Sequence, residues 1–364
     1  MSQKVLKEEE IIAFELRGLY QKYGYLPYKM SKFEEYDLYA QNKEFLEGSR
    51  IVTFNDTDGK LLALKPDITL SIVKNDVDSG AKRKVYYNEN VYRASKKTGE
   101  FKELLQVGLE CIGDIDLYDE FEALYLAAAS LASASQNFVL DISHLGIINS
   151  LLRETGCDKS FEKEALRCLA EKNAHELKAL CEKYEINEYA EKLIALIDAY
   201  GVPEEALQKV EPLCQSEETQ KACAKLKDLV NLLSETSYAD KIRLDFSVVG
   251  GGNYYDDVIF KGFVSGIGES VLSGGRYDRL LTRMGKKSGA IGFAVYLDLL
   301  EDLQKNKKTE DVDVLVLYDD EVGVSEVVKT VQMLIENGES VSAQKTTGAL
   351  RYKRMVDIRG GKKC

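Results

Sequence analysis

The sequence has no apolar run approaching the roughly 20 residues that a membrane-spanning helix needs. Its first ten residues, Met1 to Glu10, lack the apolar core of a secretory signal peptide. We therefore expect a cytoplasmic protein with no membrane contact.

Metal ligands and paired cysteines are also scarce. The only histidines are His144 and His175, and none of the seven cysteines belongs to a C-x-x-C pair. Clustered zinc sites and a disulfide framework are therefore not expected, and the thiols are predicted to be reduced and mostly structural. We predict neither a metal nor a cofactor.

Basic residues are fewer than acidic ones, 49 against 61, which gives a net charge of −12. A chain with this charge repels the phosphate backbone of nucleic acids, so nucleic-acid binding is not expected to be its main function. A local basic patch is still compatible with this charge. A length of 364 residues, with 45% hydrophobic and 30% charged residues, is typical of a soluble globular protein of two or three domains.

The first 150 residues carry mainly sheet patterns. Residues 5 to 23 have apolar side chains at helical spacing and end at Gly24, which predicts an amphipathic helix. Strands are predicted at 51–54, 61–65, 85–93 and 104–112, then a helix at 121–134 and a strand at 139–142. We read the first four strands as an antiparallel sheet.

Residues 150–237 show helical apolar spacing throughout, which we interpret as a small helical insertion without chemistry of its own. Strand patterns return at 242–248, 258–263 and 271–272, and a helix is predicted at 291–303.

A charged linker at 305–311 precedes a last unit, with a strand at 312–318, a helix at 325–337 and a strand at 340–344. This is one βαβ unit, cut short. The basic segment from Arg351 to Cys364 is interpreted as a solvated tail, with an anion site as the alternative.

The strand from Leu105 to Gly113 is the most informative. Alternation puts Gln106, Gly108 and Glu110 on one face, with Gln106 and Glu110 about 13 Å apart at 3.3 Å per residue. Glycine between them leaves room for a small polar ligand. A plain solvent-exposed strand face is the competing interpretation.

Four segments, in order, resemble the catalytic core of histidyl-tRNA synthetase, a class II aminoacyl-tRNA synthetase. They are Leu64 to Thr69, Val91 to Arg93 with Leu105 to Gly113, Tyr254 to Phe260, and Ser273 to Asp278 leading to Gly289 to Ala294. The resemblance implies an α+β fold, an antiparallel sheet with flanking helices. Its parts would be residues 1–149 and 238–304 as the core, 150–237 as the insertion, and 312–364 as a truncated anticodon-binding-like α/β unit with a basic tail.

The resemblance also implies a histidine pocket. The matching positions are Asp67, Thr69, Gln106, Glu110, Tyr254 and Tyr255, and Arg93 matches the motif 2 arginine that clamps the α-phosphate. Carboxylates can accept from an ammonium and an imidazole N–H, while hydroxyl and amide groups fix orientation. Asp67 stands where the family usually has glutamate, which shortens its reach.

Other positions depart from the synthetase pattern. Ser95 and Glu100 replace a glutamate and an arginine, Tyr296 to Leu299 lacks the motif 3 arginine, and Gly250 stands in place of a family-specific catalytic arginine. Missing cations and an added carboxylate predict loss of adenylation, unless the alignment slips by a residue or two.

The combination resembles the regulatory subunit of ATP phosphoribosyltransferase, a non-catalytic synthetase paralogue. That family implies a short-form catalytic subunit as partner in a hetero-octamer, histidine as feedback effector, and no tRNA. Class II cores dimerise through the motif 1 region, so Ile51 to Leu64 and the first helix are candidate dimer surface. Whether histidine binds in the pocket or at the subunit interface stays open. An active synthetase and a free-standing histidine sensor are the rival interpretations.

Overall fold

The computed structural model describes residues 7–46, 50–78, 80–94, 99–250, 254–300 and 310–361. The chain forms two compact units, Met1–Asp302 and Leu303–Cys364, and each is described by itself.

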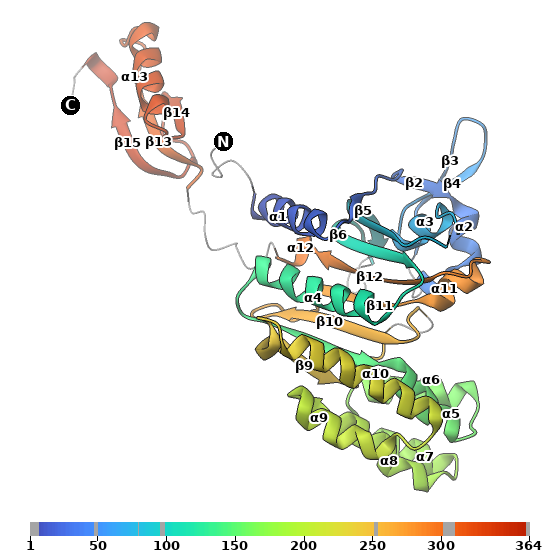
Figure 1. Ribbon diagram of the computed structural model, residues 1–364. Helices are drawn as coiled ribbons and strands as arrows, with labels where there is room; N and C mark the ends of the chain where they lie inside the picture. Colours follow the sequence, from blue (N-terminus) through green and yellow to red (C-terminus); the bar gives the residue numbers. More distant parts are fainter. Residues whose placement is uncertain are drawn as a thin grey trace. The chain divides into compact units, whose positions relative to one another are not determined.

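The first unit is built on a main sheet of nine strands, counted over the described residues (Figure 1). In spatial order these are β1 (Leu26–Pro27), β5 (Arg83–Ala94), β6 (Phe101–Gly113), β12 (Gly289–Tyr296), β11 (Leu272–Arg276), β10 (Val258–Val264), β7 (Phe138–His144), β9 (Ile242–Asp245) and β8 (Tyr200–Gly201). The predicted strands at 85–93 and 104–112 pair antiparallel here, but those at 51–54 and 61–65 belong to a separate sheet, which corrects the prediction of one sheet. Two pairs of the main sheet are parallel, β1 with β5 and β7 with β9.

Helices α1 (Glu8–Lys22) and α4 (Leu117–Ala134) pack on this sheet, and both were predicted. α1 buries Ile12, Leu16 and Tyr20 at helical spacing. α4 begins four residues before its predicted start because Asp116 caps it, accepting from the backbone N–H groups of Tyr118 and Asp119.

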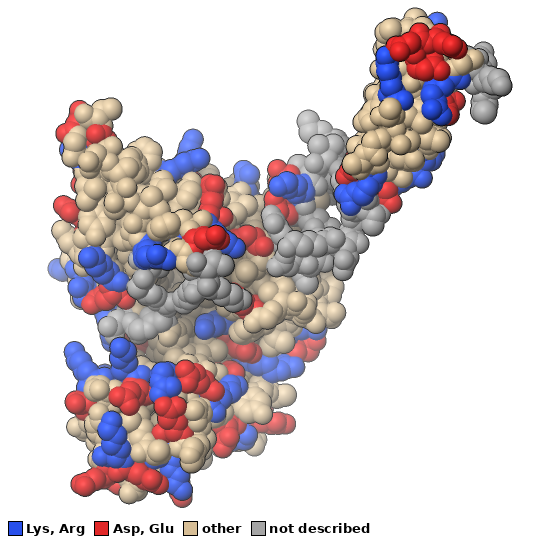
Figure 2. All heavy atoms as spheres, turned by 180° about the vertical axis from the view of Figure 1, so that it is seen from behind, with Lys and Arg blue, Asp and Glu red and all other residues tan. Residues whose placement is uncertain are grey.

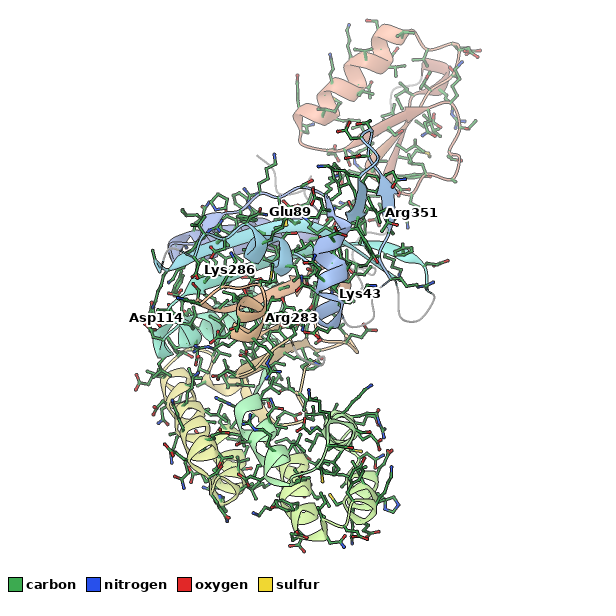
Figure 3. The ribbon with its side chains drawn as sticks, turned by 90° about the vertical axis from the view of Figure 1, so that its right-hand side faces the viewer. Lys43, Glu89, Asp114, Arg283, Lys286 and Arg351 are labelled. Atoms are coloured by element: carbon green, nitrogen blue, oxygen red, sulfur yellow. The ribbon has the colours of Figure 1, made fainter. Side chains whose placement is uncertain are left out.

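A second, three-stranded antiparallel sheet precedes the long strands, in the order β2 (Phe33–Glu35), β4 (Leu61–Leu64) and β3 (Thr53–Asn55). The short helices of this region are α2 (Tyr36–Gln41), η2 (Lys43–Leu46), α3 (Thr69–Lys74), α11 (Asp278–Arg283) and α12 (Leu297–Leu300). Arg283 pairs with Glu44, and Lys286 donates to the backbone carbonyl of Asp76 (Figure 3). These contacts tie α11 and the residues just after it to segments more than 200 residues away in sequence.

The segment predicted to be wholly helical contains α5 (Leu145–Glu154), α6 (Lys159–Ala170), α7 (Ala174–Lys183), α8 (Asn187–Asp198), α9 (Pro203–Val210), η3 (Glu211–Leu213) and α10 (Glu217–Ser234), followed by η4 (Ala239–Lys241). One part of the prediction is wrong, because β8 pairs with β9 at the edge of the main sheet. Acidic and basic side chains are interspersed over these helices (Figure 2). The domain limits at 149 and 237 stay predictions.

The predicted helix at 291–303 is wrong. Its first residues belong to β12, which lies between β6 and β11 in the middle of the main sheet, and of its described residues Leu297–Leu300 are helical. A central strand is apolar on both faces, so Ile291, Phe293 and Val295 are buried as well as Ala290, and no period of two appears. Residues 301–303 and the predicted linker up to 309 lie outside the described residues.

The second unit has a central strand β13 (Val312–Leu317), parallel to both β14 (Val341–Gln344) and β15 (Tyr352–Asp357). Helix α13 (Val324–Glu336) contributes Leu334 to a core with Val314 and Val316. The predicted solvated tail is therefore wrong for residues 352–357, which form β15, followed by η6 (Arg359–Gly361). Residues 362–364 lie outside the described part.

No helix among the described residues has the length and apolar character to cross a membrane. The described residues also contain no group of three or more His, Cys, Asp and Glu arranged to hold a metal ion.

Candidate functional site

Glu110 is the centre of the candidate site. It lies on β6, is 2% exposed, and accepts hydrogen bonds from Thr69 Oγ1 at 2.7 Å and from the hydroxyl of Tyr277 at 2.5 Å. Gly292 stands opposite it on β12, and a Cβ there would lie 1.8 Å from Glu110 Oε2. The carboxylate therefore occupies the volume that a larger neighbour would fill.

Burial raises the pKa of Glu110 to about 8, although its bonds with Tyr277 and Thr69 oppose the rise. The carboxyl is thus mostly protonated at neutral pH. A cation placed against it would favour the ionised form.

Asp67 lies just before α3, where its Oδ1 accepts from the backbone N–H of Leu70 at 2.9 Å. Burial raises the pKa of Asp67, and Arg93 partly offsets the rise. Arg93 NH2 is 3.4 Å from Asp67 Oδ2, and its Nε donates to the carbonyl of Pro66 at 2.6 Å. The one arginine that matches a phosphate clamp is therefore engaged with the pocket wall.

Tyr254 and Tyr255 form an aromatic side of the site. Their rings meet edge to face at 4.8 Å, and the ring of Tyr254 lies 5.7 Å from that of Tyr277. Burial, with nearby Asp67, raises the pKa of Tyr254, and a hydrogen bond with Thr69 opposes this rise. Both tyrosines thus belong to the same cluster as Thr69.

Gln106 is buried on the same strand, with Glu89 of β5 and Tyr296 of β12 as its cross-strand neighbours. The expected open floor at Gly108 is wrong. A Cβ there would meet the hydroxyl of Tyr87 at 2.4 Å, so this ring fills the space between Gln106 and Glu110.

The structure thus joins Asp67, Thr69, Arg93, Glu110 and Tyr254 through direct contacts and places Tyr255 against them. Gln106 is buried on the same strand, two residues from Gly108, where the hydroxyl of Tyr87 lies. Three further residues were missed: Tyr277, Tyr87 and Gly292. Tyr277 lies in the Ser273 to Asp278 motif, which was the one available signal for it.

The positions that departed from the synthetase pattern carry little positive charge. Gly250 has φ +69°, and a Cβ there would lie 2.7 Å from Ile259 Cδ1, so a side chain would be strained and crowded. Glu100 is exposed, Asp298 is half-buried in α12, and Ser95 lies outside the described residues.

A buried cation stands close by. Lys65, which is 0% exposed, places its Nζ 3.1 Å from Glu89 Oε2. Burial lowers the pKa of Lys65, although Glu89 opposes this effect. The lysine is therefore committed to Glu89 rather than available to a phosphate.

A family model described as histidyl-tRNA synthetase matches residues 3–300. The chain belongs to the histidyl-tRNA synthetase family. Among curated relatives, the ATP phosphoribosyltransferase regulatory subunit of Bacillus mycoides is 28% identical over 327 residues, covering 85% of this chain and 76% of the relative. The protein of the same name from Acetivibrio thermocellus is 28% identical over 317 residues, covering 84% and 76%.

Solved structures share the fold of this family member. A Bacillus halodurans protein described as ATP phosphoribosyltransferase regulatory subunit/histidyl-tRNA synthetase has a TM-score of 0.74 at 24% identity, covering 98% of this chain and 96% of the other. A chain of the ATP phosphoribosyl transferase (HisG:HisZ) complex from Thermotoga maritima has a TM-score of 0.63 at 18% identity, covering 78% and 96%. The resemblance to regulatory subunits and the class II fold are confirmed.

Proposed function

We propose that this chain is a non-catalytic regulatory subunit of ATP phosphoribosyltransferase. It binds a short-form catalytic subunit, is required for that subunit's activity, and mediates feedback inhibition by histidine. The curated relatives of this chain bear that name. The main support in the structure is a contrast between the residues around Glu110 and the position of the missing catalytic arginine. Thr69 and Tyr277 donate to Glu110 in the proposed amino-acid pocket, whereas Gly250, at φ +69°, stands where the resemblance implies a catalytic arginine.

The pocket suits a histidine molecule chemically. Asp67 and Glu110 can accept from the ammonium or the imidazole N–H, and Thr69 with the tyrosine hydroxyls can orient the ligand. Because Glu110 is protonated near neutral pH, a bound cation would displace its proton.

Regulation then follows from two states of the complex. Association shifts the catalytic partner toward its active arrangement, and histidine shifts it back by binding the two states with different affinity. By reciprocity, the catalytic partner changes the affinity for histidine by the same factor. A dimer of this chain within a cytoplasmic hetero-octamer is part of the proposal.

The test is co-expression with a short-form catalytic subunit, followed by size-exclusion chromatography and an activity assay with ATP and phosphoribosyl pyrophosphate. We expect a complex whose activity requires this chain and is inhibited by histidine. Histidine binding without association would instead identify a free-standing sensor, and histidine-dependent ATP–pyrophosphate exchange would identify an active synthetase.

Calorimetry on the complex tests the pocket itself. Glu110→Ala should weaken histidine binding at least tenfold, since a charge-assisted contact is lost. Glu103→Ala is the matched control, because Glu103 lies on the same strand but is exposed, and its carboxylate accepts from Tyr92 and Asn90. Equal affinity for Glu110→Ala and wild type would place histidine elsewhere.

A further inference from the structure

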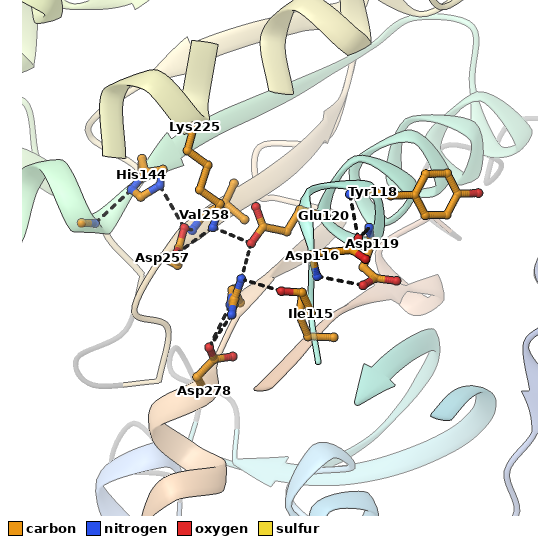
Figure 4. Close-up of polar contacts among 12 residues, drawn as sticks. Ile115, Asp116, Tyr118, Asp119, Glu120, His144, Lys225, Asp257, Val258 and Asp278 are labelled. Carbon is orange, nitrogen blue, oxygen red and sulfur yellow. Dashed lines mark hydrogen bonds and ion pairs between the residues drawn. The ribbon is translucent and has the colours of Figure 1, made fainter. Parts of the chain in front are cut away.

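Six charged or titratable side chains form one connected network beside the pocket (Figure 4). They are Glu120 of α4, His144 at the end of β7, Lys225 of α10, Asp257 before β10, Arg276 of β11 and Asp278 of α11. The network therefore links the helical insertion to four elements of the core.

Lys225 connects the two halves of this network. Its Nζ lies 2.6 Å from Glu120 Oε1 and 2.9 Å from Asp257 Oδ2. Arg276 shares the same Glu120 oxygen at 2.7 Å. Glu120 is fully buried, and its Oε2 has no partner among the described residues. A buried carboxylate is costly unless it is paired, so Glu120 depends on both cations.

Both halves lead directly to pocket side chains. Asp257 follows Tyr254 and Tyr255 in the chain, and its Oδ1 is held by His144 Nε2 at 2.9 Å and by the backbone N–H of Val258 at 2.8 Å. On the other side, Arg276 immediately precedes Tyr277, whose hydroxyl donates to Glu110. The network thus fixes the backbone on which all three pocket tyrosines stand.

The charge balance of the network depends on Lys225. The three carboxylates are opposed by two permanent cations, and burial of Asp257 is outweighed by His144 and Lys225, which together lower its pKa. Removing Lys225 leaves Asp257 beside His144 without a permanent cation, and leaves Glu120 with Arg276. Mutual repulsion would then move the two carboxylates apart.

We propose that Lys225 is a positioning residue for the pocket, through which helix α10 of the insertion is coupled to ligand binding. The insertion is then more than the inert segment that its sequence predicted. The identity of the ligand as histidine rests on the proposed function, whereas the coupling itself rests on the contacts above.

The experiment compares Lys225→Met, Lys225→Arg and Lys227→Met in the full chain. Methionine keeps the length but removes the charge, and arginine keeps a cation that can reach both carboxylates. Lys227 is the control, because it lies on the same helix but is paired with Glu211 within the insertion. Amide exchange is followed over residues 254–261 without ligand, and histidine affinity is measured by calorimetry.

We expect Lys225→Met to speed exchange over 254–261 at least fivefold and to weaken histidine binding by about tenfold, in the usual range of coupling between sites. Lys225→Arg should restore most of both effects, and Lys227→Met should match wild type. Unchanged exchange and affinity in Lys225→Met would overturn the coupling. If wild type binds no histidine while exchange still responds to Lys225, the proposed function fails and the coupling stands.

Discussion

Charged side chains are held differently in the two units. In the first, Glu110 and Glu120 are buried and bonded to residues up to 167 positions away in sequence. In the second, the ion pairs are exposed, as in Arg351 with Asp311, at 63% and 41% side-chain exposure. Buried carboxylates must be paired to be tolerated, whereas exposed pairs stay solvated with or without a partner. The first arrangement fixes geometry, and the second mainly keeps the surface soluble.

The largest effect should come from Gly292→Ala. Its Cβ would lie 1.8 Å from Glu110 Oε2 and 2.4 Å from the carbonyl of Leu109, so the strand or the carboxylate must move. We expect a loss of about 3 kcal/mol in the free energy of unfolding, measured by urea denaturation. Gly268→Ala is the control, because nothing lies within 4 Å of its Cβ. Equal stability of the two variants would contradict the crowding.

Glu110→Gln should change how stability depends on pH. Burial raises the pKa of Glu110 from 4.5 to about 8, so between these values the folded chain keeps a proton that the unfolded chain has released. The stability from this group is full below pH 4.5 and is lost as the pH rises to about 8. Relative to wild type, the variant should therefore gain about 3.5 kcal/mol between pH 5 and pH 8. Parallel profiles would show that Glu110 titrates normally.

Ligand binding should release a proton for the same reason. If histidine brings a cation to Glu110, calorimetry near pH 7 should show a binding enthalpy that varies with the ionisation enthalpy of the buffer. The variation should correspond to about one proton released and should vanish in Glu110→Gln. A buffer-independent enthalpy in wild type would mean that no proton leaves Glu110.

The smallest effect should come from the exposed pairs. Arg351→Gln or Lys353→Gln should leave the urea midpoint of the full chain unchanged within error, because both pairs are solvated. Val316→Ala in the adjacent core is the positive control, with an expected loss of about 2 kcal/mol. A clear loss in Lys353→Gln would remove the distinction between the two units.

Local pattern predicted the elements whose two faces differ. The first helix alternates buried and exposed positions, and its limits came out within three residues of the prediction. β12 failed because a strand buried on both faces has no alternation, and β15 failed because its charged side chains are partnered by Asp313 and Glu339 from distant segments. Neither condition is visible in a short window of sequence.

The candidate site also has some features that the sequence predicted and others that it did not. The family resemblance implied that Asp67, Thr69 and Glu110 share one site, and Thr69 indeed bonds Glu110 and donates its backbone N–H to Asp67. Tyr87 over Gly108 and Gly292 beneath Glu110 depend on the register of three strands, which only the folded sheet defines. Residue types can therefore predict the chemistry of such a pocket, but its free volume follows from strand pairing.

Lys65 is a natural probe for local opening of the structure around the proposed pocket. Its amine is fully covered, and a group with a lowered pKa would react quickly with an acylating reagent once uncovered. Modification of Lys65 must therefore wait for the segment around it to open, while surface lysines are labelled at once. The rate at which the peptide containing Lys65 is modified, followed by mass spectrometry, would therefore measure the rate of local opening next to the pocket.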